Sequence, residues 1–567
     1  MRKERLTYLV GGKAGEGVKK AGQVAARLFV GLGRRAIEMD DYQSLIKGGH
    51  NFSTVSTATG DITSHYDTAD VIVALDQRAL DLHKGRLNKG GVLVFNSDVA
   101  KSPEGKDVVG LPLTAEAKKY PDPALRLGLS GPAVLAAVIG LGKDEVKAFI
   151  AREYPRDTEN NIAYGLAVHN MAKEKLGTRF ELEVPKGDAA RARSILTGNE
   201  AIALGAAAAG LDMYFAYPMT PASSILHYLA ARSKDLGVTV VHPENELAVM
   251  NMAVGAAAMG ARTMVGSSGG GFALMQEAIS LAGMTETPVL CVLGSRPGPS
   301  TGVPTYTEQG DLRFAMNQGH GEFPRLVASP GTIEEAFYLA AELLGLAWQF
   351  QTPAILLTEK HLEEGSMTVD LDVSRVREAA PLMHRGDAGN YKRYLDTKSG
   401  VSPLLFPPSN ALIKWDSYEH DELGVTTEDP KAISQMHDKR RRKGEALLEH
   451  LKGMRTVNVF NGSGARSKAK GPVIFTYGST TMSVLEALRA GGLEATVVQP
   501  VYLEPFPVWE LGRFKDRKAV VVEQSCEGAF STVLKEKAGI EATWTIRRYD
   551  GRPFEPDGLA SELKGVL

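Results

Sequence analysis

Short apolar runs alternate with longer segments of helical periodicity along most of the chain. In the first third, the runs Leu6–Val10, Val71–Leu75 and Gly91–Phe95 are bounded by polar or turn residues and predict strands. A glycine-rich segment after the first run opens a helix that is expected to reach about Leu32. Strand–helix alternation of this kind predicts mostly parallel, doubly wound sheets.

The same alternation recurs from about Ser194 to Glu364. Strands are expected at Met213–Ala216, Thr239–His242, Arg262–Gly266, Val289–Leu293 and Ala354–Thr358, and helices at Glu246–Met259 and Ile333–Gln349. Alternation returns at Pro472, where PVIFTYGS, ATVVQPVYL and KAVVVEQS each predict a buried parallel strand. A third, smaller α/β domain is therefore expected at the end of the chain.

Between these regions the pattern breaks down. Residues 366–470 combine proline-rich and acidic pieces, and only one helix is predicted there, near Lys439–Met454. So long an irregular segment is uncommon inside a compact domain, and we expect it to wrap over a neighbouring domain or subunit. The predicted fold class is α/β, with three doubly wound, mostly parallel-sheet domains at 1–185, 194–365 and 471–567.

The amino-acid composition excludes several classes of function. Lys+Arg 65 against Asp+Glu 67 gives a net charge of -2, so no global basic excess indicates nucleic-acid binding. Only two cysteines, Cys291 and Cys526, occur in 567 residues, so the chain can build neither a disulfide framework nor an iron–sulfur site. No apolar run approaches the ~20 residues that cross a bilayer, and the first run is too short for a signal peptide. A cytoplasmic location without membrane attachment is expected.

Two glycine-rich turns in the first third have a structural and a functional interpretation. Gly11–Gly17 lies between a strand and a helix, where backbone N–H groups favour an anion. Its spacing differs from the dinucleotide-binding G-x-G-x-x-G, and Glu16 would repel a pyrophosphate, so a tight turn or an intersubunit role is favoured. Lys47–Asn51 contains a lone histidine at a turn, which is usually structural.

Thr220 occupies a rigid turn. The segment Tyr217-Pro218-Met219-Thr220-Pro221 follows a strand and precedes a helix, and ligand crevices of open α/β sheets lie at such strand ends. Two prolines fix the backbone and leave the Thr220 hydroxyl available to a ligand. A threonine before a proline is equally a standard helix start, so the turn alone leaves both interpretations open.

Glu246 opens a helix that is apolar on nearly every face. Taken alone, this glutamate is best explained by the helix dipole, although apolar surroundings could make it a poised acid. The run Gly266–Gly271 also precedes a helix, and a tight turn is its favoured interpretation. Arg296 follows the strand VLCVLGS, where bidentate recognition of a carboxylate and a surface loop position are equally plausible.

These motifs together resemble the 2-oxoacid:ferredoxin oxidoreductases. The alpha subunit of that family carries a Y-P-I-T-P turn, a Glu before a G-A-rich helix, and R-x-G-P-S-T-G-x-P-T leading to Q-x-D-L. This chain has Y-P-M-T-P, E-N-E-L-A-V-M-N-M-A-V-G-A, R-P-G-P-S-T-G-V-P-T and E-Q-G-D-L in the same order. G-G-K-A-G-E-G-V and S-L-I-K-G-G-H-N are similar to a gamma domain fused at the N-terminus, and Q-P-V-Y-L-E-P-F-P is similar to a transketolase-C-like domain.

Two features of that family are absent from this chain. Neither the G-D-G motif for diphosphate and Mg²⁺ nor the cysteines of a [4Fe–4S] cluster are present. Both belong to the family's beta subunit. The resemblance therefore implies an alpha subunit that needs a beta partner, as an (αβ)₂ heterotetramer, and that binds thiamine diphosphate together with it.

The resemblance also implies roles for individual residues. Glu246 would hydrogen-bond N1′ of the aminopyrimidine, whereas Glu244 does not fit the family's spacing to Gly255. Arg296 would pair with the substrate carboxylate. Thr220 would donate to substrate or cofactor, and Tyr217 would contact the cofactor. No metal ligand is expected in this chain.

The implied reaction is oxidative decarboxylation of a 2-oxoacid with coenzyme A, giving an acyl-CoA, CO₂ and reduced ferredoxin. The two-subunit layout is most like that of 2-oxoglutarate enzymes, which form succinyl-CoA, and the reverse, CO₂-fixing direction is possible. A pyruvate or broad-specificity enzyme remains an alternative. The missing G-D-G disfavours a self-sufficient transketolase- or pyruvate dehydrogenase-type enzyme, and the intact residue set disfavours a non-catalytic regulatory subunit.

Overall fold

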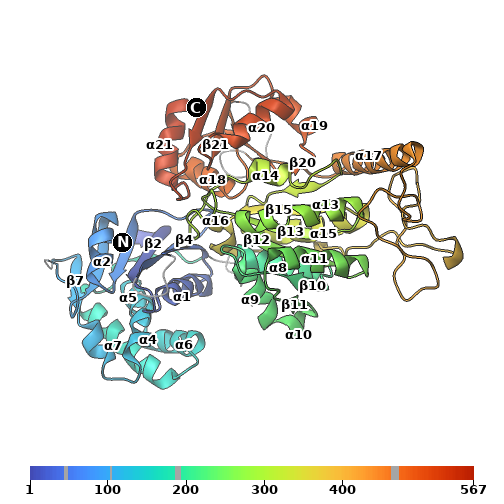
Figure 1. Ribbon diagram of the computed structural model, residues 1–567. Helices are drawn as coiled ribbons and strands as arrows, with labels where there is room; N and C mark the ends of the chain where they lie inside the picture. The colour runs from blue at the N-terminus through green and yellow to red at the C-terminus, as the bar shows by residue number, and fades with distance from the viewer. Residues whose placement is uncertain (44–48, 103–104, 186–192, 461–470) are drawn as a thin grey trace. The chain divides into compact units, whose positions relative to one another are not determined.

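The chain forms two compact units in the computed structural model, which describes residues 1–43, 49–102, 105–185, 193–460 and 471–567. Unit 1 comprises residues 1–196, 365–370 and 555–557. Unit 2 comprises residues 197–364, 371–554 and 558–567. In Figure 1 unit 1 is mainly blue to cyan, and unit 2 runs from green to red.

Unit 1 is built on an eight-stranded sheet in the order β7-β6-β5-β2-β4-β3-β16-β9. Its first four strands are parallel to one another, whereas β4 is antiparallel to both of its neighbours and β16 is antiparallel to β3. The bounds are β2 Arg5–Lys13, β3 Arg35–Tyr42, β4 His50–Ala58, β5 Ala69–Ala74, β6 Leu87–Asn96, β7 Val108–Leu111, β9 Ser194–Thr197 and β16 Ser366–Val369.

The antiparallel half of this sheet has no counterpart among the strands expected from the apolar pattern. Strand β4 reads HNFSTVSTA, and its buried part, 53–58, is mostly serine and threonine. Cross-strand hydrogen bonds make that burial possible, as between Thr7 Oγ1 and Ser56 Oγ at 3.0 Å. A search for apolar runs overlooks such a strand because its buried hydroxyl groups bond to neighbouring strands, as Ser53 does to Glu38 and Ser56 to Thr7.

Helices complete unit 1. Helix α5 is buried along its whole length, and it packs between α1 and α7. A small two-stranded sheet pairs β1 (Arg2–Lys3) with β8 (Glu181–Leu182). The helices are α1 Val18–Gly31, α2 Gln77–His83, α3 Leu113–Ala117, α4 Pro123–Arg126, α5 Ser130–Val138, α6 Lys143–Glu153 and α7 Thr158–Leu176.

Unit 2 contains a seven-stranded sheet in the order β11-β10-β12-β13-β15-β14-β20. All neighbours are parallel except β20, which is antiparallel to β14. Helix α11 packs against β10 and β12, while α8 and α15 pack against each other. The strands are β10 Met213–Phe215, β11 Thr239–Val241, β12 Thr263–Ser268, β13 Leu290–Ser295, β14 Leu326–Ala328, β15 Ala354–Glu359 and β20 Tyr502–Glu504.

A five-stranded sheet in unit 2 has the order β17-β19-β18-β21-β22 and is parallel except for β17. The single strand expected over ATVVQPVYL is wrong: the segment divides at Val501, with β19 in this sheet and β20 in the seven-stranded one. The bounds are β17 Val457–Phe460, β18 Val473–Phe475, β19 Thr496–Pro500, β21 Ala519–Glu523 and β22 Trp544–Arg547. The expected α/β class with mostly parallel sheets is confirmed.

The remaining helices surround these two sheets. They are α8 Gly198–Ala208, α9 Ser223–Ala231, α10 Ser233–Leu236, α11 Glu246–Ala258, α12 Gly269–Leu274, α13 Gln276–Met284, α14 Leu312–Met316, α15 Ile333–Phe350, α16 Lys360–Glu364, α17 Pro430–Lys452, α18 Thr480–Gly491, α19 Val508–Leu511, α20 Ala529–Ala538 and α21 Pro556–Val566. The expected start of the helix near Lys439 is wrong. Helix α17 begins at Pro430, because Asp429 accepts a hydrogen bond from the amide of Ala432 and proline suits the first turn.

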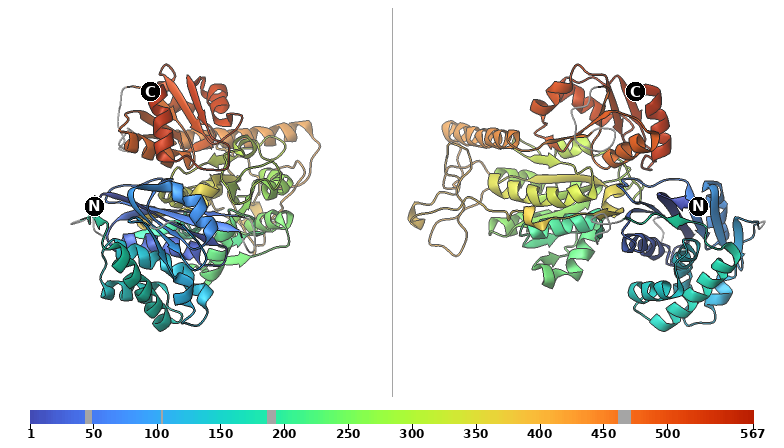
Figure 2. Two further views of the ribbon diagram at one scale, coloured as in Figure 1. Left: turned by 90° about the vertical axis from the view of Figure 1, so that its left-hand side faces the viewer. Right: turned by 180° about the vertical axis from the view of Figure 1, so that it is seen from behind.

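A buried ionic cluster fixes α17 to the end of α13. Lys439 Nζ lies 2.7 Å from Glu286 Oε1, Lys443 Nζ lies 2.7 Å from Glu286 Oε2, and all three side chains are buried. Arg393, from the loops before α17, donates to the backbone carbonyls of residues 285 and 286. Figure 2 shows α17 and these loops together at one end of unit 2. The irregular segment is thus held by charge as well as by packing.

Candidate functional site

Three neighbouring strands of unit 2 end side by side and carry the candidate residues. Strands β10, β12 and β13 are adjacent and parallel, so their carboxyl ends meet at one edge. The Thr220 turn follows β10, Ser267 lies at the end of β12, and Arg296 follows β13. This edge is where open α/β sheets bind ligands.

Glu246 is the first residue of α11 and is only 3% exposed. Asn245 caps the helix, accepting a hydrogen bond from the amide of Ala248 at 2.9 Å. The cap therefore occupies the helix start without using the Glu246 carboxylate. Glu244, by contrast, is exposed. The structure separates the two carboxylates: one faces the protein interior and the other faces solvent.

The Glu246 carboxylate lies against the β12–α12 junction. Ser267 Oγ donates to Glu246 Oε1 at 3.5 Å and also approaches Met219 Sδ at 3.8 Å. A Cβ at Gly271 would collide with both Ser267 Oγ and Glu246 Oε1. The run Gly266–Gly271 is thus no isolated turn, since β12 passes directly into α12 and its last glycine leaves room for the carboxylate.

Arg296 connects two strand ends. Its Nη1 donates to the carbonyl oxygen of Thr220 at 2.8 Å. The side chain is half-buried, and burial lowers its pKa, an effect that the nearby Asp311 opposes. Burial raises the pKa of Asp311, whose carboxylate accepts a hydrogen bond from Ser295 Oγ at 2.9 Å. One guanidinium N–H is thus used within the protein, and other donors of the fork remain.

Tyr217 is the most exposed of the four expected site residues. Its side chain is 39% exposed, and its ring centroid lies 5.9 Å from that of His242. Both rings follow strand ends, those of β10 and β11. An exposed aromatic beside the Thr220 turn offers an apolar surface to a ligand.

The structure thus brings Thr220, Glu246 and Arg296 to one edge, linked through Met219 and Ser267. Ser267, Gly271 and Asp311 also belong to this group, and none of them was expected there from the sequence. Asp311 stands in the E-Q-G-D-L motif that carried the resemblance, and that position was the available indication. Ser267 had none, because its closeness to Glu246 depends on α11 packing against β12.

The Gly11–Gly17 turn of unit 1 contains backbone conformations that favour glycine. Gly15 and Gly17 have φ values of 96° and 78°, which favour glycine, and Glu16 accepts a hydrogen bond from the Lys13 amide at 2.8 Å. Lys47 and Gly48 lie outside the described residues. His50 is buried, and its Nε2 lies 2.9 Å from His83 Nε2.

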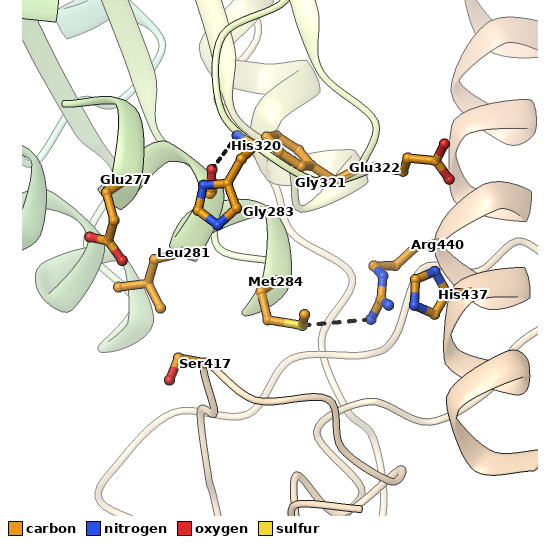
Figure 3. A pocket seen from close by; sticks show the side chains of 12 residues that line it. Glu277, Leu281, Gly283, Met284, His320, Gly321, Glu322, Ser417, His437 and Arg440 are labelled. Atoms are coloured by element: carbon orange, nitrogen blue, oxygen red, sulfur yellow. Dashed lines mark hydrogen bonds between the residues drawn. The ribbon is translucent and has the colours of Figure 1, made fainter. Parts of the chain in front are cut away.

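One pocket of about 190 Å³ lies apart from the site residues (Figure 3). Its lining comes from α13, the 320–323 loop, Ser417 and α17, where His437 and Arg440 both pair with Glu419. Neither Thr220, Glu246 nor Arg296 lines it. Among the described residues, no cluster of three or more His, Cys, Asp or Glu could hold a metal ion. In the same residues, no helix is both long and apolar enough to span a membrane.

The alpha subunit of 2-oxoacid:ferredoxin oxidoreductase 2 from Aeropyrum pernix is 30% identical to this chain, over 99% of this chain and 98% of that protein. The chain belongs to the 2-oxoacid:ferredoxin oxidoreductase family. The subunits of this family are those of oxidoreductases, as the resemblance implied. The 2-oxoglutarate synthase subunit KorA of Archaeoglobus fulgidus is 29% identical over 66% of this chain and 99% of that protein.

Family and structural comparisons agree with this membership. Residues 204–438 match the family described as "Pyruvate flavodoxin/ferredoxin oxidoreductase, thiamine diP-bdg", and residues 7–170 match "Pyruvate ferredoxin/flavodoxin oxidoreductase". The 2-oxoglutarate:ferredoxin oxidoreductase from Magnetococcus marinus, solved with 2-oxoglutarate, coenzyme A and succinyl-CoA bound, is similar with a TM-score of 0.89 and 27% identity, covering 99% of each chain.

The residues present fit the pyrimidine end of thiamine diphosphate. Among the described residues, the buried Glu246 carboxyl accepts a single long hydrogen bond, from Ser267, so it can meet a ring nitrogen, and the absence of a side chain at Gly271 leaves room for the carboxylate itself. The region that matches the thiamine diphosphate family contains Glu246, Gly271 and Arg296.

Proposed function

We propose that this chain, with a beta subunit, oxidatively decarboxylates 2-oxoglutarate with coenzyme A and passes the electrons to ferredoxin. The products are succinyl-CoA, CO₂ and reduced ferredoxin, and the reaction can also run in the reverse, CO₂-fixing direction. The observation that carries the proposal is the convergence of Glu246, Thr220 and Arg296 at one sheet edge. The KorA relative and the 2-oxoglutarate:ferredoxin oxidoreductase structure, which covers 99% of the chain, support this substrate. The generic 2-oxoacid relative matches over more of the chain than the KorA subunit does, 99% against 66%.

Thiamine diphosphate, when bound, supplies the electron sink for decarboxylation. In this proposal Glu246 holds a proton between its carboxylate and N1′ of the aminopyrimidine, and Ser267 orients the carboxylate through its hydrogen bond. Asn245 keeps the helix start capped, so Glu246 stays free for this task. Tyr217 provides an apolar contact at the rim.

Arg296 and Thr220 are proposed to hold the substrate. Arg296 donates one N–H to the Thr220 carbonyl, which orients the guanidinium group. Its other N–H donors would bind the C1 carboxylate of the 2-oxoacid. Thr220 would direct its hydroxyl toward substrate or cofactor from the same turn. In this proposal the chain's own residues bind and orient the substrate. No residue is assigned to the second carboxylate of 2-oxoglutarate.

The partner is proposed to carry what this chain lacks. A beta subunit with a G-D-G motif would bind Mg²⁺ and the diphosphate, and its cysteines would hold a [4Fe–4S] cluster, in an (αβ)₂ assembly. The two cysteines of this chain, buried Cys291 and exposed Cys526, are both free, in keeping with a reducing, cytoplasmic location.

The decisive experiment is co-expression with a chain that carries G-D-G and cysteines, followed by a viologen-reduction assay on 2-oxoglutarate, pyruvate and a branched 2-oxoacid. Preference for 2-oxoglutarate supports the proposal, and equal use would favour the broad-specificity alternative.

This chain alone should bind thiamine diphosphate weakly in calorimetry and show no iron–sulfur absorbance. Tight binding by the isolated chain would contradict the proposed division of the cofactor site. A complex that binds cofactor but turns over none of these acids would indicate a regulatory subunit.

We also propose that residues 1–185, 194–365 and 471–567 are separate domains joined by the 366–470 segment. Three large sheets support this division, although β9, β16 and β20 each extend the sheet of another region. Limited proteolysis followed by mass spectrometry should release stable fragments that correspond to these three ranges.

A further inference from the structure

Buried hydroxyl groups line one face of the seven-stranded sheet in unit 2. The strand register pairs Ser268 of β12 with Gly294 of β13, and Gly294 with Thr358 of β15. Paired residues of parallel strands present their side chains to the same face. The Tyr214 hydroxyl joins them, because a Cβ at Gly266, two residues before Ser268, would collide with it.

The Glu363 carboxylate lies over the middle of this row. Glu363 belongs to α16 and is fully buried. A Cβ at Gly294 would lie 2.6 Å from its Oε1 and 2.8 Å from its Oε2. Neighbouring strands are separated by ~4.8 Å, so Ser268 and Thr358 flank the carboxylate on either side.

None of these buried oxygens has a hydrogen-bond partner among the described residues. Both oxygens of Glu363 and the hydroxyls of Tyr214, Ser268 and Thr358 are unsatisfied. Leaving one such group unpaired costs roughly 1–3 kcal/mol, and native proteins rarely do so. Five unsatisfied oxygens on one face, none of which hydrogen-bonds to another, indicate an occupant that is not part of the chain.

Charge determines the kind of occupant. Among the described residues, the charged groups that shift the pKa of Glu363 are Glu364 and Glu359, both acidic, while Lys360 lies 3.9 Å from Glu364. A buried carboxylate without a compensating cation is costly. Burial, with these two neighbours, raises the pKa of Glu363 well above its usual range, so without a cation this carboxyl favours its protonated, neutral form. Oxygen ligands are the choice of hard cations, and one carboxylate balances one positive charge.

We propose that Glu363, Ser268, Thr358 and Tyr214 form a buried binding site for a monovalent metal cation. The site lies close to the candidate active site, since Gly294 precedes Arg296 by two residues and Ser268 follows Ser267. Gly198, at the start of α8, packs against the Leu362 carbonyl of α16, and Asn199 Nδ2 donates to the Pro221 carbonyl at 2.8 Å, so α8 connects α16 to the Thr220 turn. A bound cation would tie β10, β12 and β15 to α16. The proposal does not depend on the substrate or the partner.

Thermal unfolding of the full-length chain tests the site. Its Tm should rise by a few degrees, saturably, when KCl or NaCl replaces choline chloride at constant ionic strength, because a ligand of the native state stabilises it. Glu363→Gln should abolish this difference. Glu494→Gln, which removes an exposed carboxylate, should keep it. Thr358→Val and Ser268→Ala should each raise the half-saturating salt concentration severalfold, which keeps the test usable if Glu363→Gln fails to fold.

Equal Tm values in KCl, NaCl and choline chloride would overturn the proposal and leave water around a protonated Glu363 as the occupant. An unchanged salt response in Thr358→Val, Ser268→Ala and Glu363→Gln would also overturn it, because the cation would then bind elsewhere. Loss of enzymatic activity plays no part in either outcome, so this test is separate from that of the proposed function.

Discussion

Gly271 and Glu246 touch across the β12–α12 junction: a Cβ at Gly271 would collide with Glu246 Oε1. The two residues are 25 positions apart in sequence, and their contact exists because α11 packs against β12. The absence of a side chain at Gly271 is therefore a property of the carboxylate site.

Gly271→Ala should impair the site while leaving most of the fold intact. The added methyl group must displace the Glu246 carboxylate or the Ser267 hydroxyl, so thiamine diphosphate affinity and kcat/KM of the assembled enzyme should fall at least tenfold. Gly270→Ala is the matched control, since a Cβ there meets nothing within 4 Å. Alanine in place of this helical glycine should be neutral or stabilise by up to ~1 kcal/mol. Equal effects of the two changes, measured by calorimetry and viologen reduction, would remove Gly271 from the site.

Glu246→Gln should slow proton exchange at C2 of the bound cofactor by ~10²–10⁴-fold, because glutamine keeps the shape but cannot hold the acid proton. Subunit assembly should survive, since the Asn245 cap and the helix are unchanged. Deuterium exchange at C2, followed by NMR after acid quench, measures this step without requiring turnover. Glu244→Gln changes an exposed carboxylate and should be mild. The reverse ranking of the two variants would show that the carboxylates were assigned wrongly.

The apolar pattern predicted the parallel sheets well, because buried parallel strands are continuous apolar runs. It failed where burial is achieved otherwise. The buried part of strand β4 consists mostly of serine and threonine. Strand β20 follows β19 in the sequence but pairs with β14 in a different sheet. Neither property is encoded in local periodicity.

The candidate residues could be named from motifs, yet their surroundings could not. Ser267 and Gly271 approach Glu246 only through the packing of α11 on β12, and Glu363 reaches Gly294 only through α16. The ionic cluster around Glu286 joins residues more than 150 positions apart, which no single-sequence pattern indicates.

Glu286→Gln should destabilise unit 2 by about 3–5 kcal/mol, since Lys439 and Lys443 would be left buried without their carboxylate. Glu445→Gln, an exposed partner of Arg441 on the same helix, should cost less than ~1 kcal/mol. Urea unfolding followed by circular dichroism gives both values. A loss below ~1 kcal/mol for Glu286→Gln would mean that packing alone holds α17.

The ionic cluster around Glu286 should also make the folding stability of the protein fall at acidic pH. Burial alone would raise the pKa of Glu286, but Lys439, Lys443 and Arg393 outweigh it and hold that pKa well below its usual range. A carboxyl with a depressed pKa contributes stability that is complete above its unfolded-state pKa and is lost as the pH falls toward the folded value. Wild-type stability should therefore decline below about pH 5, and Glu286→Gln should show a shallower decline. Parallel pH profiles would contradict this assignment.

Arg296→Lys separates substrate binding from a structural role. Lysine can still donate one hydrogen bond to the Thr220 carbonyl, which the guanidinium makes at 2.8 Å, but it cannot offer a carboxylate the two parallel bonds of the fork. Losing a charge-assisted contact costs about 1.5–3 kcal/mol, so kcat/KM for the 2-oxoacid should fall roughly ten- to more than a hundredfold. Cofactor binding and subunit assembly should be retained, which calorimetry and gel filtration can establish.

The comparison of substrates in this variant decides which carboxylate Arg296 holds. Equal proportional losses for pyruvate and 2-oxoglutarate would place it on the C1 carboxylate that both acids share, as proposed. A loss confined to 2-oxoglutarate would move it to the distal carboxylate and contradict the assigned role. If Arg296 only tied β13 to the Thr220 turn, lysine would change stability by less than about 0.5 kcal/mol and leave both kcat/KM values unchanged. Steady-state kinetics on the two acids, with thermal unfolding measured alongside, distinguishes the three outcomes.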